Sequence, residues 1–203
     1  MRDSTRISAG GRSQFGTVLY VVMVSATFFM GRSAMSPLLL DVEEAFGVSH
    51  AESSALMVAF TVGYGLAMLF SGFASQRVTH RRLIPASAFV GALGMSVLAV
   101  AGSMAAMRVG LFVFGAGFGV FAPTGINMIA GVVQRKNWQK AFSVNELSPH
   151  AGMILAPLLV DALRPILPWR GAFALLAGLL VLVALIFSIG SRGGNGYGSA
   201  PSP

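Results

Sequence analysis

The sequence predicts an all-α, polytopic membrane protein with six transmembrane helices and both termini in the cytoplasm. Of its 203 residues, 55% are hydrophobic and only 10% are charged, whereas soluble domains carry about 25% charged residues. The mean hydropathy is +0.74, and a water-soluble domain of this size cannot bury that much apolar surface. The apolar residues form long continuous runs and do not alternate with polar ones, which favours helices over barrel strands.

Six stretches reach the roughly 20 mostly apolar residues that a membrane-spanning helix needs. The first is longer than a minimal span, which predicts a tilted helix or one that protrudes from the bilayer. The flanking segments are a basic tail at residues 1–14 and a Gly/Ser/Pro-rich tail at 191–203, expected to be disordered. Between them, the bundle of residues 15–190 contains predicted helices at 15–40, 55–75, 83–102, 107–133, 139–162 and 169–190.

If successive predicted helices cross the membrane in opposite directions, the basic residues lie unevenly on its two sides. Three arginines, Arg108, Arg164 and Arg170, fall at the end that also carries an acidic first loop. By the positive-inside rule, the richer end is cytoplasmic, so the net charge of +7 indicates topology in a cytoplasmic (inner) membrane and not nucleic-acid binding. The ten basic residues at that end are Arg2, Arg6, Arg12, Arg77, Arg81, Arg82, Arg135, Lys136, Lys140 and Arg192.

No catalytic pattern appears in the sequence. The absence of cysteine excludes a thiol nucleophile and a cysteine-based metal site. Nucleophile elbows, zinc-protease helices and phosphate-binding loops are also missing, so we expect no enzyme, no cofactor and no metal. Gly115, Gly117 and Gly119 have neither the spacing nor the preceding strand of a dinucleotide fingerprint; we interpret them as a helix-packing face.

Arg32 lies within the first predicted helix, where a charged side chain is costly. One interpretation is a fixed cation that faces a central cavity and binds an anionic group of a substrate through its two-pronged guanidinium. The other is an arginine that extends to the outer interface. Asn145 and Asn127 are further polar residues expected to line the substrate cavity.

Glu146 and His150 stand four residues apart in the fifth predicted helix, which places them on one face. A carboxylate and an imidazole in this arrangement can share and pass a proton. The alternative is that Glu146 pairs with Lys140 or Arg135 near the cytoplasmic interface. Arg108 is the third residue assigned to proton coupling, either at the interface or reaching inward.

The loop after the second predicted helix reads Gly72-Phe-Ala-Ser-Gln76-Arg77-Val-Thr79-His-Arg81-Arg. It resembles the signature loop of the major facilitator superfamily, Gly-x-Leu-Ala-Asp-Arg-x-Gly-Arg-Arg, with Gln76 in place of the acidic residue and Thr79 in place of the second glycine. The resemblance implies that Gly72, Gln76, Arg77 and Arg81 form a cytoplasmic gate between two helical bundles.

Further segments resemble the same family in the same order along the chain. Residues 152–157 are similar to its fifth-helix Gly-x-x-x-Gly-Pro motif, and Trp169 and Arg170 to its usual entry into the sixth helix. Arg108 resembles the fourth-helix arginine, about one turn early. The resemblance implies one six-helix half of a twelve-helix transporter, built from two inverted three-helix repeats.

The function we expect is secondary active transport of a small solute, and Arg32 permits a small organic anion as that solute. Symport and antiport both remain open. The partner would be a second six-helix half or a second copy of the chain. The alternative is a truncated or non-transporting bundle that is inert or serves as an assembly or regulatory partner.

Overall fold

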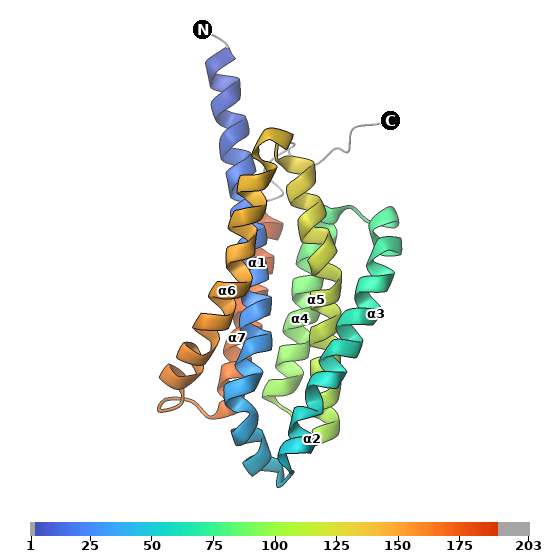
Figure 1. Ribbon diagram of the computed structural model, residues 1–203, viewed down its shortest axis with the longest axis vertical. Helices are drawn as coiled ribbons and strands as arrows, with labels where there is room; N and C mark the ends of the chain where they lie inside the picture. Colours follow the sequence, from blue (N-terminus) through green and yellow to red (C-terminus); the bar gives the residue numbers. More distant parts are fainter. Residues whose placement is uncertain (1–2, 191–203) are drawn as a thin grey trace.

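The computed structural model describes the backbone of residues 3–190 and the side chains of residues 14–73, 78–79 and 82–188. Within this part every regular element is helical, which confirms the all-α prediction (Figure 1). A short helix α2 (His50–Ser54) and a 3-10 turn η1 (Arg135–Asn137) connect longer elements. The six long helices are α1 (Asp3–Phe46), α3 (Leu56–Arg77), α4 (His80–Ala99), α5 (Met104–Val132), α6 (Trp138–Leu163) and α7 (Trp169–Gly190).

The first helix is longer at both ends than the sequence predicts. It begins at Asp3, so most of the expected basic tail continues α1, and it runs past Leu40 to Phe46 despite Pro37 within it. Helix propagation adds one hydrogen bond per ordered residue, so a helix need not end where its apolar run ends. The second predicted tail, residues 191–203, lies outside the described residues.

Five of the long helices in the described part are long and apolar enough to cross a membrane, one fewer than the sequence predicts. The exception is α6, which has the length but carries Asn145, Glu146 and His150. Polar groups of this kind lie within a membrane only when they face protein or a cavity. The five candidate spans are Gln14–Phe46, His50–Phe73, Arg82–Ala99, Met104–Val132 and Trp169–Ser188.

The helices pack in a pattern with internal symmetry. In Figure 1, α6, α1, α5 and α3 lie toward the viewer and α4 and α7 behind them. The main partners of α5 are α3 and α4, those of α1 are α6 and α7, and α4 also packs on α7. If α1, α3 and α4 form one repeat and α5, α6 and α7 the other, exchanging the corresponding helices gives the same set of contacting pairs. Two inverted three-helix repeats require this symmetry.

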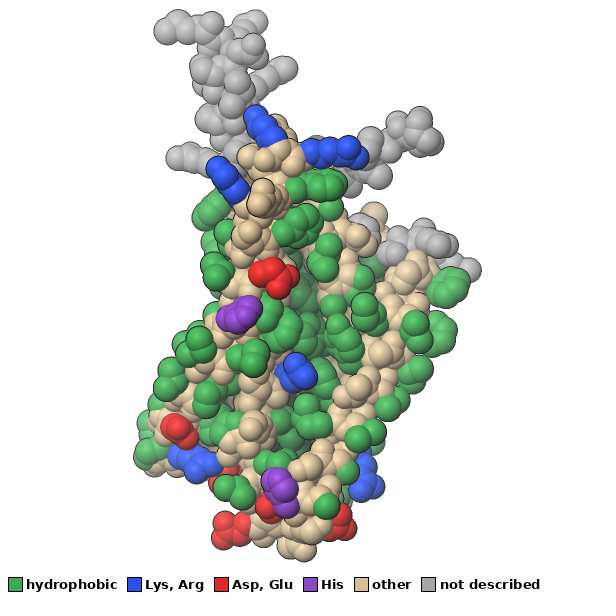
Figure 2. Space-filling view, in the orientation of Figure 1, with side chains coloured by type: hydrophobic (Ala, Val, Ile, Leu, Met, Phe, Trp, Pro, Cys, Tyr) green, Lys and Arg blue, Asp and Glu red, His purple; other side chains and the backbone are tan. Residues whose placement is uncertain are grey.

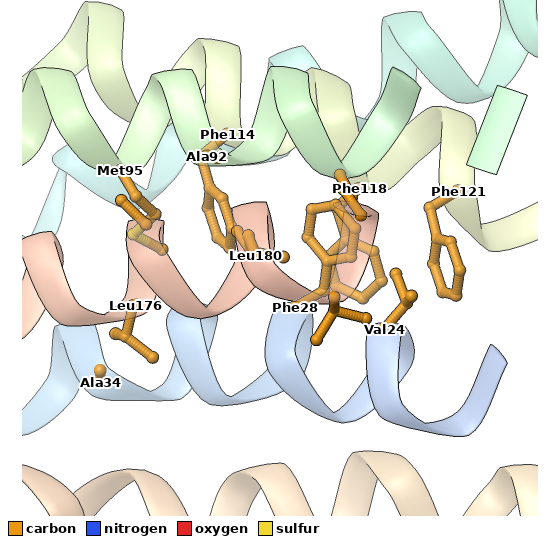
Figure 3. Packing of buried hydrophobic residues seen from close by; sticks show 14 of the residues in the cluster. Val24, Phe28, Ala34, Ala92, Met95, Phe114, Phe118, Phe121, Leu176 and Leu180 are labelled. Atoms are coloured by element: carbon orange, nitrogen blue, oxygen red, sulfur yellow. The ribbon is translucent and has the colours of Figure 1, made fainter. Parts of the chain in front are cut away.

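Aromatic side chains join α1 to α5 at the centre of the bundle (Figure 3). Phe28 of α1 is fully buried, and its ring stacks on Phe118 and Phe121 of α5 at centroid distances of 5.0 and 5.4 Å. Phe114, one turn away on α5, lies 5.7 Å from the same ring. Such offset and tilted pairs add about 0.5–1.5 kcal/mol each beyond the area they bury.

Glycines bring α5 into direct backbone contact with its neighbours. A Cβ on Gly115 would collide with the backbone oxygen of Phe60 in α3, and one on Gly117 would lie 2.7 Å from the backbone oxygen of Ser87 in α4. In lipid, where water provides no drive for helix association, close backbone approach is a main source of packing energy. The interpretation of the α5 glycines as a packing face is therefore confirmed.

Candidate functional site

One face of the bundle combines an apolar surface with polar side chains. Figure 2 views the side formed by α6, α1, α5 and α3, and shows acidic, histidine and basic side chains within its largely hydrophobic middle. Charged side chains otherwise gather toward the two ends of the molecule. Two neighbouring clefts open on these helices.

The first cleft, here called the Arg32 cleft, has a volume of about 280 Å³. The Arg32 guanidinium carbon lies 5.8 Å from the centre of the Phe60 ring, within cation–π distance. In the part of the chain that the structure describes, no carboxylate forms an ion pair with Arg32. The cleft is lined by Phe29 and Arg32 of α1, Phe60, Thr61 and Tyr64 of α3, and Phe118 of α5.

The second cleft, here called the Asn145 cleft, has a volume of about 170 Å³ and lies between α1, α5 and α6, with Tyr64 of α3. Both Asn145 and Glu146 line it. The Oδ1 atom of Asn145 is buried and has no hydrogen-bond partner among the described residues. An unpaired buried acceptor of this kind requires an explanation, and a ligand or water is a common one.

Three aromatic side chains line both clefts: Phe29 from α1, Tyr64 from α3 and Phe118 from α5. Phe29 and Tyr64 each meet the Phe118 ring edge-to-face, at centroid distances of 4.9 and 5.4 Å. These contacts hold together the three rings that the two clefts share.

A side-chain hydrogen bond next to Pro149 stabilises the backbone of α6 beside the Asn145 cleft. Proline has no N–H to donate to the carbonyl four residues earlier, which here belongs to Asn145. The hydroxyl of Ser148 donates to that oxygen instead, at 2.5 Å. Ser148 is almost completely buried, so its hydroxyl provides the backbone oxygen of Asn145 with a donor where water does not reach.

Glu146 and His150 both lie exposed on α6, one turn apart. The imidazole Nδ1 of His150 donates to the backbone oxygen of Glu146 at 2.8 Å, and not to its carboxylate. Among the described residues, Glu146 also forms no ion pair with Lys140 or Arg135; the Arg135 guanidinium instead lies 5.6 Å from the Trp138 ring. The spacing therefore places the two titratable groups side by side without pairing them.

The structure does not bring every predicted site residue to these clefts. Arg108 lies exposed in the first turns of α5, where its charge acts on Glu52 of α2, far along the bundle from Glu146 near the start of α6. Asn127 is exposed on α5 and lines neither cleft. Gly72 lies near the end of α3 in an apolar groove of about 890 Å³ that extends to Pro123.

The remaining residues assigned to the gate, Gln76, Arg77 and Arg81, have side chains outside the described residues. Their backbone forms the last turn of α3 and the first turn of α4.

Polar contacts at the α2 end of the bundle were not predicted from the sequence. The Arg164 guanidinium, just after α6, donates to the Asp41 carboxylate at 3.1 Å and to the backbone oxygen of Pro37 at 2.7 Å. Ser53 and His50 of α2 both bond to Glu43 of α1, at 2.6 and 2.7 Å. The only signal in the sequence was the mixture of acidic and basic residues in these loops.

Residues 21–197 match the family model described as Major Facilitator Superfamily. The chain belongs to this superfamily. The membership confirms the resemblance found in the sequence and the prediction that the chain is a membrane transporter-family protein and not an enzyme.

Two curated relatives of the superfamily come from Escherichia coli strain K12. The probable L-galactonate transporter is 23% identical over 188 residues, which cover 91% of this chain and 40% of the relative. Multidrug resistance protein D is 23% identical over 172 residues, covering 85% of this chain and 43% of the relative. The chain thus spans less than half the length of the curated relatives it matches.

Solved structures of the superfamily share the fold. A bacterial homologue of the human lysosomal transporter Spinster, in an inward-facing and unoccupied conformation, superposes with a TM-score of 0.80 at 16% identity. The proton:xylose symporter XylE superposes with a TM-score of 0.78 at 14% identity. The match covers 94% and 89% of this chain, respectively, and 45% of each of those chains. The six-helix bundle therefore corresponds to about half of a full-length transporter of the superfamily.

Proposed function

We propose that the chain is one six-helix bundle of a two-bundle secondary transporter that moves a small organic anion across the cytoplasmic membrane. The observation that carries this proposal is Arg32. Among the residues whose side chains are described, no carboxylate pairs with its charge, which lies in a cleft lined largely by aromatic rings. A charge placed at membrane depth costs about 2.5–3.5 kcal/mol on insertion scales, which an anionic ligand would offset through a bidentate bond.

The names of the relatives agree with a small-molecule substrate but differ in its chemistry. One is a probable transporter of L-galactonate, a carboxylate, and the other is a multidrug resistance protein. The fold alone does not select between such substrates. The choice of an anion therefore rests on Arg32 and agrees with the first of these names.

The second bundle would be another six-helix half or a second copy of the chain. The clefts lie on the face formed by α1, α3, α5 and α6, and a facing bundle there would enclose them between two walls. Binding sites of such transporters lie at the interface of the repeats near the bilayer midplane. In this arrangement α6 also crosses the membrane, with Asn145 and Glu146 turned to a cavity and not to lipid.

The proposed orientation has both termini in the cytoplasm, because the basic residues concentrate at that end. Gly72, Gln76, Arg77 and Arg81 would then form the cytoplasmic gate that the family resemblance implies. Glutamine at position 76 removes one charge from this gate, so it would rely on hydrogen bonds more than on an ion pair.

Proton coupling is assigned to Glu146 and His150. Glu146 lines the Asn145 cleft, and its neighbour His150 uses Nδ1–H for the backbone bond, so Nε2 is not engaged in that bond. The two groups could therefore exchange a proton with water in the cavity as it opens to either side.

The test is uptake by the full chain reconstituted in liposomes, with radiolabelled L-galactonate as the first probe. Arg32→Gln should abolish uptake, whereas Arg135→Gln, which removes an exposed charge near the end of the bundle, should leave it intact. Unchanged uptake by the Arg32→Gln variant would overturn the role of Arg32. No uptake of any carboxylate by the wild-type chain would contradict transport by a pair of copies of this chain.

A further inference from the structure

We propose that the Arg32 cleft and the Asn145 cleft together bind one aromatic carboxylate that carries a hydrogen-bond donor at the end opposite its carboxylate. This inference rests on the proposed function, since it specifies the anion that the chain would transport. It follows from three features of the described residues: a cation in one cleft, aromatic rings that line both clefts, and an unpaired acceptor beside the other cleft.

The cationic end is Arg32. Its guanidinium already lies over the Phe60 ring, a contact that leaves the edge of its fork available for two parallel bonds to a carboxylate. Glu146, which lines the other cleft, repels a carboxylate. The two charges therefore orient an asymmetric anion, with its carboxylate toward Arg32 and its other end toward α6.

The aromatic surface selects the body of the ligand. Phe29, Tyr64 and Phe118 line both clefts, and their edge-to-face contacts fix the ring planes. Aromatic pairs gain energy beyond simple burial when centroids are about 4.5–7 Å apart. A cavity of about 150 Å³ accommodates a benzene molecule, so clefts of about 280 and 170 Å³ have room for a single ring with its substituents.

The acceptor end is Asn145. Its Oδ1 is buried and has no partner among the residues that the structure describes, while the residue lines the cleft. The χ2 torsion of asparagine is broad, so a modest rotation turns the amide toward a bound ligand. A hydroxyl or amine at the far end of the ring would then donate to Oδ1 and remove the cost of an unpaired buried acceptor.

Calorimetry on the full chain in nanodiscs tests the inference with defined probes, using empty nanodiscs to subtract lipid partition. We expect 4-hydroxybenzoate to bind about tenfold more tightly than benzoate, the effect of one buried hydrogen bond. Benzoate should bind about two- to tenfold more tightly than cyclohexanecarboxylate, which lacks the aromatic ring. Equal binding within either pair would overturn the inference.

Substitution of Asn145 tests whether this residue causes the preference for 4-hydroxybenzoate over benzoate. Asn145→Leu keeps a similar volume but removes the acceptor, so the advantage of 4-hydroxybenzoate over benzoate should fall to about onefold. Ser143→Ala, an exposed change on the same helix, should keep the advantage. If Asn145→Leu retains it, Asn145 is not the acceptor and the inference fails. If that variant does not fold, the wild-type comparison of the three probes decides alone.

L-galactonate separates this inference from the proposed function. Binding of L-galactonate without binding of the aromatic acids would overturn the inference and keep the organic-anion transporter. Failure of all four carboxylates to bind would overturn both.

Discussion

His150 donates from its ring Nδ1 to the backbone oxygen of Glu146 at 2.8 Å. The two residues are thus joined through the main chain, and the carboxylate and the second ring nitrogen are both left for other partners. This differs from a side-chain ion pair, in which each group would hold the other in its charged form. The proton-coupling role proposed for the two residues rests on this open arrangement.

Replacing the carboxylate tests the coupling role. Glu146→Gln fixes a neutral side chain of the same size, so uptake should no longer respond to an imposed proton gradient. The measurement is initial uptake in liposomes with equal and unequal pH across the membrane. A gradient response equal to that of the wild type would contradict the assignment.

The packing of α5 on α3 predicts a position-specific effect of adding one methyl group. Gly115→Ala places a Cβ against the backbone oxygen of Phe60, and overpacking of this kind typically costs about 1–3 kcal/mol. Gly178→Ala is the matched control, because nothing lies within 4 Å of a Cβ at that position of α7. Thermal unfolding in detergent should show a lower midpoint for Gly115→Ala alone. Equal midpoints would mean that the α3–α5 contact is looser than described.

The hydroxyl of Ser148 is expected to matter because it replaces a bond that Pro149 cannot make. Ser148→Ala leaves the Asn145 oxygen without this donor, which should cost about 1–3 kcal/mol for a buried group. Ser143→Ala, on the exposed side of α6, should change stability by less than about 0.5 kcal/mol. Urea unfolding of the two variants in detergent would compare them, and equal losses would contradict the account.

The pair between Arg164 and Asp41 should contribute little to stability. Its side chains are 47% and 31% exposed, and pairs of that kind contribute about 0.2–1 kcal/mol. A double-mutant cycle of Arg164→Gln and Asp41→Asn should therefore give a coupling energy below about 1 kcal/mol, and one that falls further in high salt. A salt-independent coupling above 2 kcal/mol would show instead that the pair is desolvated.

The sequence predicts the long helices well because continuous apolar runs leave few alternatives in a membrane. It does not predict the continuation of α1 to Asp3, since polar residues neither require nor prevent a helix there. The short helix α2 was also missed, although Ser49 and Glu52 carry a capping-box pattern. That pattern is readable from the sequence alone.

The site was only partly predictable, and the reason is helix rotation. Asn145 and Glu146 line a cleft, whereas Asn127, directly after the cleft residues Gly125 and Ile126, points elsewhere. Successive residues of a helix differ by 100°, and apolar residues surround the middle turns of α5, so no periodicity marks its cavity face. The contacts of Arg108 and Arg164 likewise depend on tertiary structure.

Uptake of a carboxylate compared with uptake of its neutral amide is the sharpest test of anion binding by Arg32. The measurement is uptake of benzoate and benzamide by the reconstituted full chain, corrected for passive entry into protein-free liposomes. We predict protein-dependent uptake of benzoate, none of benzamide, and loss of benzoate uptake in Arg32→Gln. Equal protein-dependent uptake of both compounds, unaffected by Arg32→Gln, would contradict it.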